Sequence, residues 1–158
     1  MGKLTGENHG DAANELFAFY QYKASELEEA GQPFMAAVTL ALSVETALLT
    51  YLLVEFTEEN GGPLEIPDSA GFSDLIEIAN EIDVLSAPID QPSHAREDDA
   101  PPKYIAKDVI DKIRKFRNLI HPTRAMRESF DPRGFGTGQL QVYKELHESV
   151  MHSLLYYI

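Results

Sequence analysis

The sequence predicts an all-α fold, a bundle of four to five helices, for this chain of 158 residues. Apolar residues recur at helical spacing through most of the chain, and the alternation typical of a half-buried strand is not evident. Glycine and proline interrupt these apolar stretches, as they commonly do between helices. Apolar residues make up 44% of the chain, enough for a hydrophobic core, so we expect one domain over residues 1–158.

Glycine and proline separate the first two predicted helices. The first helix is expected from Asp11 to Glu29, and Gly31 is placed to end it, because glycine is favoured just past a helix C-terminus. Pro33 opens the second helix at a position where proline is tolerated. The second helix should then run to a glycine-rich break at residues 58–63.

The second helix is long enough to be tested as a membrane span. Its apolar stretch from Phe34 to Phe56 could cross a bilayer by length alone. Glu45 stands at the centre of this stretch, however, and an unpaired carboxylate in the middle of a membrane is costly. We therefore expect a helix buried within a bundle, and no membrane partner.

Two long loops flank the third predicted helix. Ser73 is expected to cap this helix, and its apolar residues continue at helical spacing to Leu85. The loops are expected around residues 59–72 and 86–102, and the second of them is rich in proline and acidic residues.

The fourth helix is expected from about Lys103 to Ile120, and the last helix from about Leu140 to the chain end. Pro122 disfavours helical geometry at the residue before it, so His121 should mark the end of the fourth helix. An apolar stripe on the fourth helix is expected to face the core: Ile105, Val109, Ile113, Phe116 and Ile120.

The end of the fourth helix gathers the most chemistry. Arg114, Arg117, Asn118 and His121 are one or two helical turns apart, so we expect their side chains to converge on a side that faces away from the core. Two guanidinium groups, an amide and an imidazole suit a phosphate ligand. Ile110 shares the side of Arg117 and His121, and an apolar residue beside exposed cations indicates a partner surface.

The net charge of −13 is distributed unevenly along the chain. Residues 103–133 hold nine basic and four acidic residues, a net charge of +5, and the rest of the chain carries −18. Because an acidic body repels polyanions, a polyanion could approach only this basic region. The alternative is an ordinary solvated helix with scattered lysines.

The composition argues against several kinds of site. Cysteine is absent, so disulfides and thiolate metal sites are excluded, and no apolar run at the N-terminus suggests secretion. His147 and His152 are five residues apart, which misses the helical spacing that would place both on one metal ion. We expect no metal, no other cofactor and a cytoplasmic location.

Residues 43–49 (SVETALL) in the second helix and 113–122 (IRKFRNLIHP) in the fourth carry a family resemblance. With these motifs the chain resembles the HEPN superfamily of helical-bundle domains, and it is also similar to mannitol-operon repressor proteins. The pattern that defines HEPN domains is an arginine, a short spacer and a histidine. Arg114 lies within the usual distance of His121, whereas Arg117, which is followed by the expected polar residue, lies one residue short. Either arginine can therefore fill the motif position.

The resemblance implies a helical homodimer in which the two motif helices meet around a cleft. Many HEPN domains are metal-independent ribonucleases, and the resemblance implies this chemistry here. His121 would then transfer protons, Arg114 and Arg117 would hold the phosphate, and Asn118 would orient the histidine or the scissile group. Such a ribonuclease is expected to have a toxin-like or defence-related role, with RNA or a nucleotide-like ligand as its partner.

Three further residues are expected to support substrate binding. The resemblance implies that Glu45 reaches the site from the second helix and anchors an arginine. Lys115 and Arg124 add positive charge beside the cluster.

A second interpretation of the same residues stays open. The helix end can be purely structural, with Arg117 and Asn118 satisfying exposed carbonyls and His121 favoured by the helix dipole. Glu45 can be a buried acid that one arginine neutralises. A non-catalytic dimeric module that binds a protein or a nucleotide-like ligand would use the same surface.

Overall fold

The computed structural model describes residues 2–55, 64–82, 84–85, 88–89 and 104–155, and it confirms the all-α fold. A π-helical turn, Tyr51–Glu55, continues the second helix. The α-helices in the described residues are α1 (Gly6–Glu29), α2 (Pro33–Thr50), α4 (Phe72–Glu81), α5 (Ala106–Arg117), α6 (Pro122–Arg127) and α7 (Thr137–Leu155).

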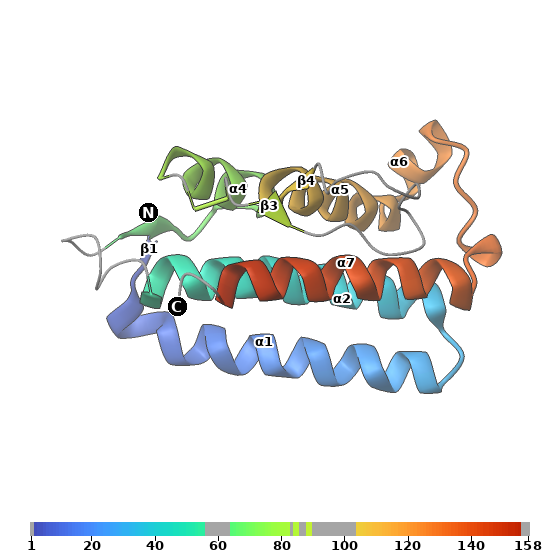
Figure 1. Cartoon of the computed structure of the whole chain (residues 1–158), viewed down its shortest axis with the longest axis horizontal. Coiled ribbons are helices and arrows are strands. Elements are labelled where there is room, and N and C mark those ends of the chain that lie inside the picture. The colour runs from blue at the N-terminus through green and yellow to red at the C-terminus, as the bar shows by residue number, and fades with distance from the viewer. Residues whose placement is uncertain (1, 56–63, 83, 86–87, 90–103, 156–158) are drawn as a thin grey trace.

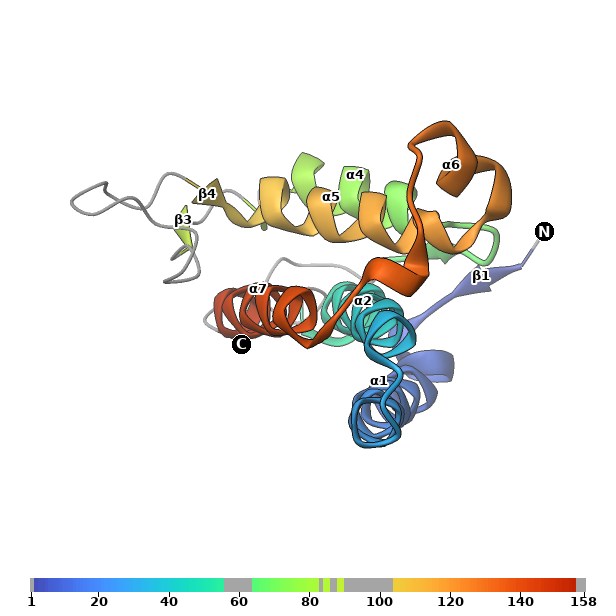
Figure 2. The same ribbon diagram turned by 90° about the vertical axis from the view of Figure 1, so that its right-hand side faces the viewer.

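The helices are arranged in three layers (Figure 1). α1 lies on one side, α2 and α7 run next to each other in the middle, and α4, α5 and α6 form the layer opposite to α1. The end-on view in Figure 2 shows the same order. α2 contacts α1, α4, α5 and α7, so it is the central helix of the bundle.

α2 has the burial expected of a core helix. The segment Pro33–Val54 is long and apolar enough to cross a membrane, with a mean hydropathy of 1.8, but 67% of its most apolar stretch is buried inside the protein. Its hydroxyl groups are satisfied within the helix, because Thr39, Thr46 and Thr50 donate hydrogen bonds to carbonyls one turn earlier. The helix therefore buries few polar groups without a partner.

α1 begins at Gly6 rather than at the predicted Asp11. Thr5 caps the helix, because its Oγ1 accepts a hydrogen bond of 3.2 Å from the N–H of Asn8. The N–H of Thr5 in turn donates to Nδ1 of His9 over 3.0 Å. The start of the helix was predicted from the spacing of apolar residues. Its first turn is polar, so that spacing gave no sign of it.

The helix boundaries predicted at Gly31 and Pro33 are confirmed, whereas the N-cap predicted at Ser73 is wrong, and the fourth helix begins at Ala106 after β4 (Tyr104–Ile105) and not at Lys103. Gly31 has a φ of 73°, the left-handed conformation expected after a helix end, and Pro33 is the first residue of α2. Ser73 does not cap α4. Gly71 is the N-cap instead, and its N–H donates to the carboxylate of Asp74 over 2.9 Å.

The predicted long loops contain short strands that sequence reasoning missed. In the first loop, β2 (Ile66–Pro67) pairs with β1 (Lys3–Leu4) near the N-terminus. In the second, β3 (Pro88–Ile89) pairs with β4 (Tyr104–Ile105), which follows the loop, and the rest of the loop lies outside the described residues. Two-residue strands are too short to show alternation, so no periodic signal could have found them.

α5 buries most of its predicted apolar stripe. Val109, Ile113 and Phe116 are all buried. Ile120 is 42% exposed, contrary to the prediction. The backbone tightens into a 3₁₀ turn over residues 118–120, and the change from about 3.6 to about 3 residues per turn moves the later side chains off the α-helical stripe.

The prediction of a partner surface at Ile110 is wrong, because Ile110 is 0% exposed and belongs to the main core. α5 packs against α2, α4 and α7, so a wider arc of the helix is buried than a single stripe would give. Arg117 lies two turns after Ile110 on the same side. It is therefore placed at the edge of the core and not on the open surface.

A cluster of aromatic rings holds the end of α5 and the segment after α6 on the bundle. The ring of Phe116 stacks on Tyr143 of α7, with centroids 4.1 Å apart. Phe34 at the start of α2 contacts Phe116, Phe130 and Phe135 at centroid distances of 5.7, 5.4 and 5.8 Å. These contacts fix the position of the α5–α6 junction.

The close approach of α1 to the π-helical turn Tyr51–Glu55 predicts the effect of one substitution. In Gly6→Ala the new Cβ would collide with the backbone carbonyl of Leu53, so the free energy of unfolding should fall by about 1–3 kcal/mol. Gly138→Ala is the control, since a Cβ there meets open space within α7 and should leave stability unchanged or raise it by up to about 1 kcal/mol. Urea unfolding of both variants measures the difference, and equal effects would contradict the close approach.

Candidate functional site

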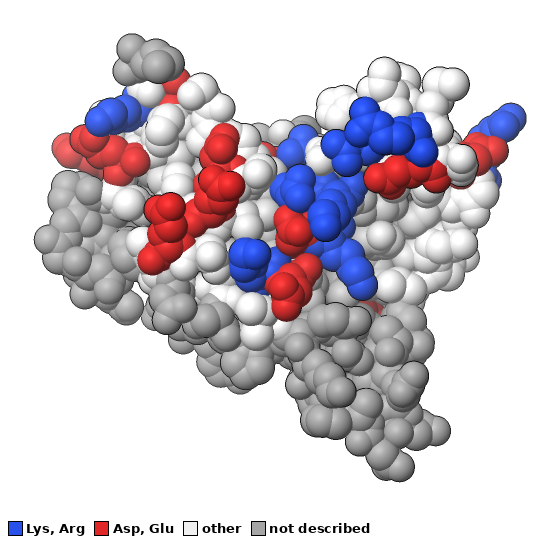
Figure 3. Space-filling view, turned by 90° about the horizontal axis from the view of Figure 1, so that it is seen from above, with Lys and Arg blue, Asp and Glu red and all other residues white. Residues whose placement is uncertain are grey.

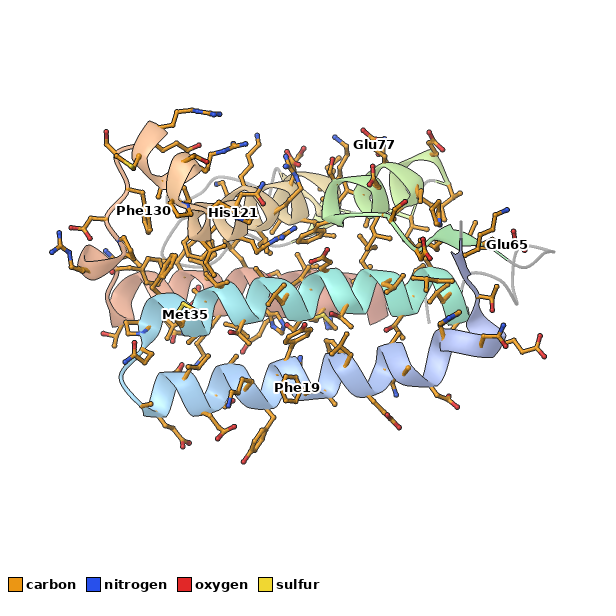
Figure 4. All side chains as sticks on the ribbon, turned by 180° about the vertical axis from the view of Figure 1, so that it is seen from behind. Phe19, Met35, Glu65, Glu77, His121 and Phe130 are labelled. Atoms are coloured by element: carbon orange, nitrogen blue, oxygen red, sulfur yellow. The ribbon has the colours of Figure 1, made fainter. Side chains whose placement is uncertain are left out.

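The predicted site lies where α5 passes into α6. Asn118 begins the 3₁₀ turn that ends α5, and His121 follows with φ −79° and ψ 125°. This extended conformation confirms the helix end that Pro122 predicted, and Pro122 opens α6. His121 is exposed, and Figure 4 shows it above Met35, which lies near the start of α2.

Arg117 turns inward to α2 and α4. Its Nη2 lies 3.9 Å from Oε2 of Glu45, and both side chains are largely buried, with 22% and 23% of their surface exposed. The guanidinium carbon lies 5.8 Å from the ring centroid of Phe72, within the range of a cation–π contact. Its Nε is buried and has no hydrogen-bond partner among the described residues.

Glu45 is the acid that faces Arg117 from α2. Burial raises the pKa of Glu45, and the attraction of Arg117 offsets only part of this effect. The 3.9 Å separation is that of an ion pair without a close hydrogen bond, which explains why the offset is incomplete. The arginine that Glu45 contacts is thus Arg117 and not Arg114.

Arg114 and Lys115 both bind Asp111 on their own helix. Arg114 donates a hydrogen bond of 2.9 Å from Nε to Asp111, and Nζ of Lys115 lies 3.4 Å from the same carboxylate. Desolvation alone would raise the pKa of Asp111, but Arg114 and Lys115 outweigh it and lower that pKa. Sequence reasoning missed Asp111, although its spacing of one turn from both cations is visible in the sequence.

The cluster is therefore less convergent than predicted. Within the described part of the chain, no side-chain hydrogen bond or ion pair joins any two of Arg114, Arg117, Asn118 and His121, although backbone hydrogen bonds link Asn118 to Arg114 and to His121. Each arginine is committed to a carboxylate, and His121 stands apart from both at the helix junction. Arg124 of α6 likewise lies 3.9 Å from Glu128.

The face of the molecule that Figure 3 displays is nevertheless divided by charge. Lysines and arginines gather over α5 and α6, whereas acidic side chains cover α4 beside them. Surface ion pairs such as those of Lys115 and Arg124 contribute little stability, so an incoming anion can displace them at low cost. An anion on this face would displace surface ion pairs only and would not require rearrangement of the core.

Sequence reasoning also missed a buried polar pair between α2 and α7. Ser43 is 0% exposed and His147 is 8% exposed, and Oγ of Ser43 lies 2.8 Å from Nε2 of His147. The Ser43 hydroxyl has one proton, and the carbonyl of Leu40 also lies 2.7 Å from its Oγ. When Ser43 donates to Leu40 it accepts from a protonated Nε2 of His147, and in that tautomer His147 cannot take a proton from Ser43.

A signal for this pair was present in the sequence. His147 is one turn from Tyr143 and Val150, which belong to the apolar stripe of the last helix. Burial lowers the pKa of His147 to about 4. A polar residue among the core-facing residues of a helix needs a buried hydrogen-bond partner. Ser43 in the apolar second helix is that partner for His147.

Comparison with protein-family models, with curated proteins and with solved structures finds no match to this chain.

Buried His147 predicts a specific loss of stability in acid. The unfolded chain takes up a proton near pH 6.5 and the folded chain only near pH 4, so the free energy of unfolding should fall between these values by at most about 3 kcal/mol on account of this residue. His147→Gln retains a donor for Ser43 but cannot titrate, so its stability should fall less over this range. Urea unfolding at several pH values tests this.

Ser43→Ala is the matched control for the acid experiment. It should lower stability at neutral pH by about 1–2 kcal/mol while retaining the acid-dependent loss, because His147 remains buried. Parallel curves of stability against pH for the unchanged protein and His147→Gln would show that His147 is not the titrating group.

Proposed function

We propose that this chain is a HEPN-like domain that binds RNA through the face over α5 and α6 and cleaves it without a metal ion. The observation that supports this proposal is an exposed histidine on a basic face of an otherwise acidic protein. A second support is Arg117, which Glu45 and Phe72 hold in place one turn before His121. Positioned charge of this kind is what phosphoryl transfer requires.

In the proposed reaction the RNA supplies its own nucleophile. The 2′-hydroxyl attacks the adjacent phosphorus, the bond from phosphorus to the 5′-oxygen breaks, and a 2′,3′-cyclic phosphate forms. A histidine removes the proton from the 2′-hydroxyl, and a second protonated group returns one to the leaving oxygen. His121 serves as one of these groups, and a second copy of His121 from a dimer partner can serve as the other. Arg114, Lys115 and Arg124 neutralise the phosphate.

The proposed dimer needs a contact other than Ile110. Ile120 and Met126 are 42% and 81% exposed, and they lie in the sequence on either side of His121. A two-fold contact through these two residues would bring the two copies of His121 together. It would also cover apolar surface that is otherwise in water.

The ion pairs of the cluster favour a second candidate function, a module that binds RNA or a nucleotide-like ligand without cleaving it. Arg114 and Arg117 are each paired with a carboxylate, and no described residue orients His121. Such a module would still bind through the same basic face.

RNA cleavage in the presence of a chelator separates the two functions. His121→Ala should slow cleavage by about 10²–10⁴-fold, the usual contribution of a general acid or base. His152→Ala is the matched control and should cut at the normal rate, because the C-terminal end of α7 lies at the opposite end of the molecule from α6. Fluorescence anisotropy measures RNA binding separately. If the protein binds RNA but shows no cleavage that depends on His121, the ribonuclease proposal is excluded and the non-catalytic module remains.

The proposed dimer contact predicts a change of particle mass. Met126→Glu should shift the protein from dimer to monomer in light scattering, because it places a charge in the two-fold contact. Tyr22→Glu is the control: it places a charge at another exposed apolar residue, 67% exposed on α1, and should leave the mass unchanged. The same mass in both variants would exclude Met126 from the dimer contact.

A further inference from the structure

A pocket opens between α1, α2 and α4, and Glu45 is among the residues that line it. Its volume is about 210 Å³. α1 contributes Leu16 and Tyr20 to its wall, and the turn after β2 contributes Ala70. Its other lining residues are Leu4, Leu42, Glu45, Thr46, Leu49, Ile66 and Leu75.

The floor of the pocket is the least buried stripe of α2. Leu42, Glu45 and Leu49 are partly exposed, whereas most of their neighbours on the helix are buried. Glu45 is the one charged side chain among the described residues that line the pocket. Met35, which is 38% exposed, lies further along the same side of α2, and Figure 4 shows it on the same face of the molecule as Phe19 of α1.

The carboxylate of Glu45 lacks a close donor. Arg117 stays 3.9 Å away, which is beyond hydrogen-bond distance, and no hydrogen bond to Glu45 is made by a described residue. The surrounding side chains are almost all apolar. A half-buried carboxylate in such surroundings gains most from a ligand that brings a charged donor of its own.

The charged residues around the pocket favour a ligand of positive charge. A second hollow adjoins the pocket, since Ala70 lines both, and Asp74, Glu77 and Glu81 of α4 line that second hollow. These acids form the acidic area beside the basic face in Figure 3. An anion would be repelled from this side of the molecule, and a cation would be attracted to it.

We propose that this pocket binds a small organic cation, a primary ammonium group on an apolar body. The ammonium donates hydrogen bonds to the carboxylate of Glu45. The apolar body lies on Leu42 and Leu49, and the ring of Tyr20 adds a wall that suits a cation or a flat group. The site does not depend on RNA binding, so it can exist whether or not the proposed ribonuclease activity does.

Benzylammonium is a probe of suitable size, and benzyl alcohol and benzoate are its neutral and anionic counterparts. Titration at constant ionic strength, followed by protein NMR, should give saturable binding of benzylammonium with a Kd of about 1 mM. Resonances of residues around Glu45 should shift. Benzyl alcohol should bind at least ~10-fold more weakly, because a neutral hydroxyl forms a weaker hydrogen bond with a carboxylate. Benzoate should not bind.

Three variants decide whether Glu45 is the recognition group. Glu45→Gln keeps the shape of the side chain and should weaken benzylammonium binding at least ~10-fold. Leu16→Arg, at a rim position that is 43% exposed, keeps Glu45 but supplies a tethered cation, and it should weaken binding similarly. Glu77→Gln is the matched control on the acidic surface of α4, outside the pocket, and should bind the probe normally.

Each of three results would overturn the proposal. The first is equal binding of benzylammonium and benzyl alcohol, which would mark a purely apolar pocket. The second is a loss in Glu77→Gln as large as that in Glu45→Gln, which would mark general attraction to an acidic surface. The third is an absence of saturable binding to the unchanged protein.

Discussion

The burial of α2 by helices on several sides is the constraint on which the rest of the structure depends. Each large aliphatic side chain that α2 buries contributes about 1.5–3 kcal/mol, so the bundle is organised around this helix. A helix in this position has no fully exposed side on which to place polar groups. Its threonines accordingly bond to its own backbone, and its remaining polar side chains each need a partner from another helix.

Glu45 is a polar side chain of α2 whose need for a partner from another helix is met only in part. It draws Arg117 away from the surface and ties α2 to the end of α5, so the residue that resembles a catalytic arginine also has a structural task. Removal of either partner would leave a charge largely buried and unpaired, which costs more than the pair itself contributes. The carboxylate of Glu45 therefore has two roles: it forms the ion pair with Arg117, and it is the charged group in the wall of an otherwise mostly apolar pocket.

The sequence was a good guide to what local chemistry decides and a poor one to what packing decides. Gly31, Pro33 and Pro122 act through their own backbone preferences, so the boundaries they predict are correct. The exposure of Ile110 depends on how many helices pack against α5, and the spacing of apolar residues along one helix does not predict that number. The family resemblance implied that Glu45 anchors an arginine, but it indicated neither which arginine nor the distance and burial of the pair. Asp111 and Thr5 carried short-range signals, a spacing of one turn and a capping position, that were overlooked.

The hydrogen bond between Ser43 and His147 has a consequence for how the helices align. Close-packed apolar side chains favour one alignment of neighbouring helices, but the hydrophobic attraction between them has no direction of its own. A shift of α7 along α2 by one turn, about 5.4 Å, would leave both polar groups buried without a partner. The pair thus adds little net stability, yet it penalises every other register of α7 on α2. Since Phe116 stacks on Tyr143 of α7, that choice of register also determines where the end of α5 is held.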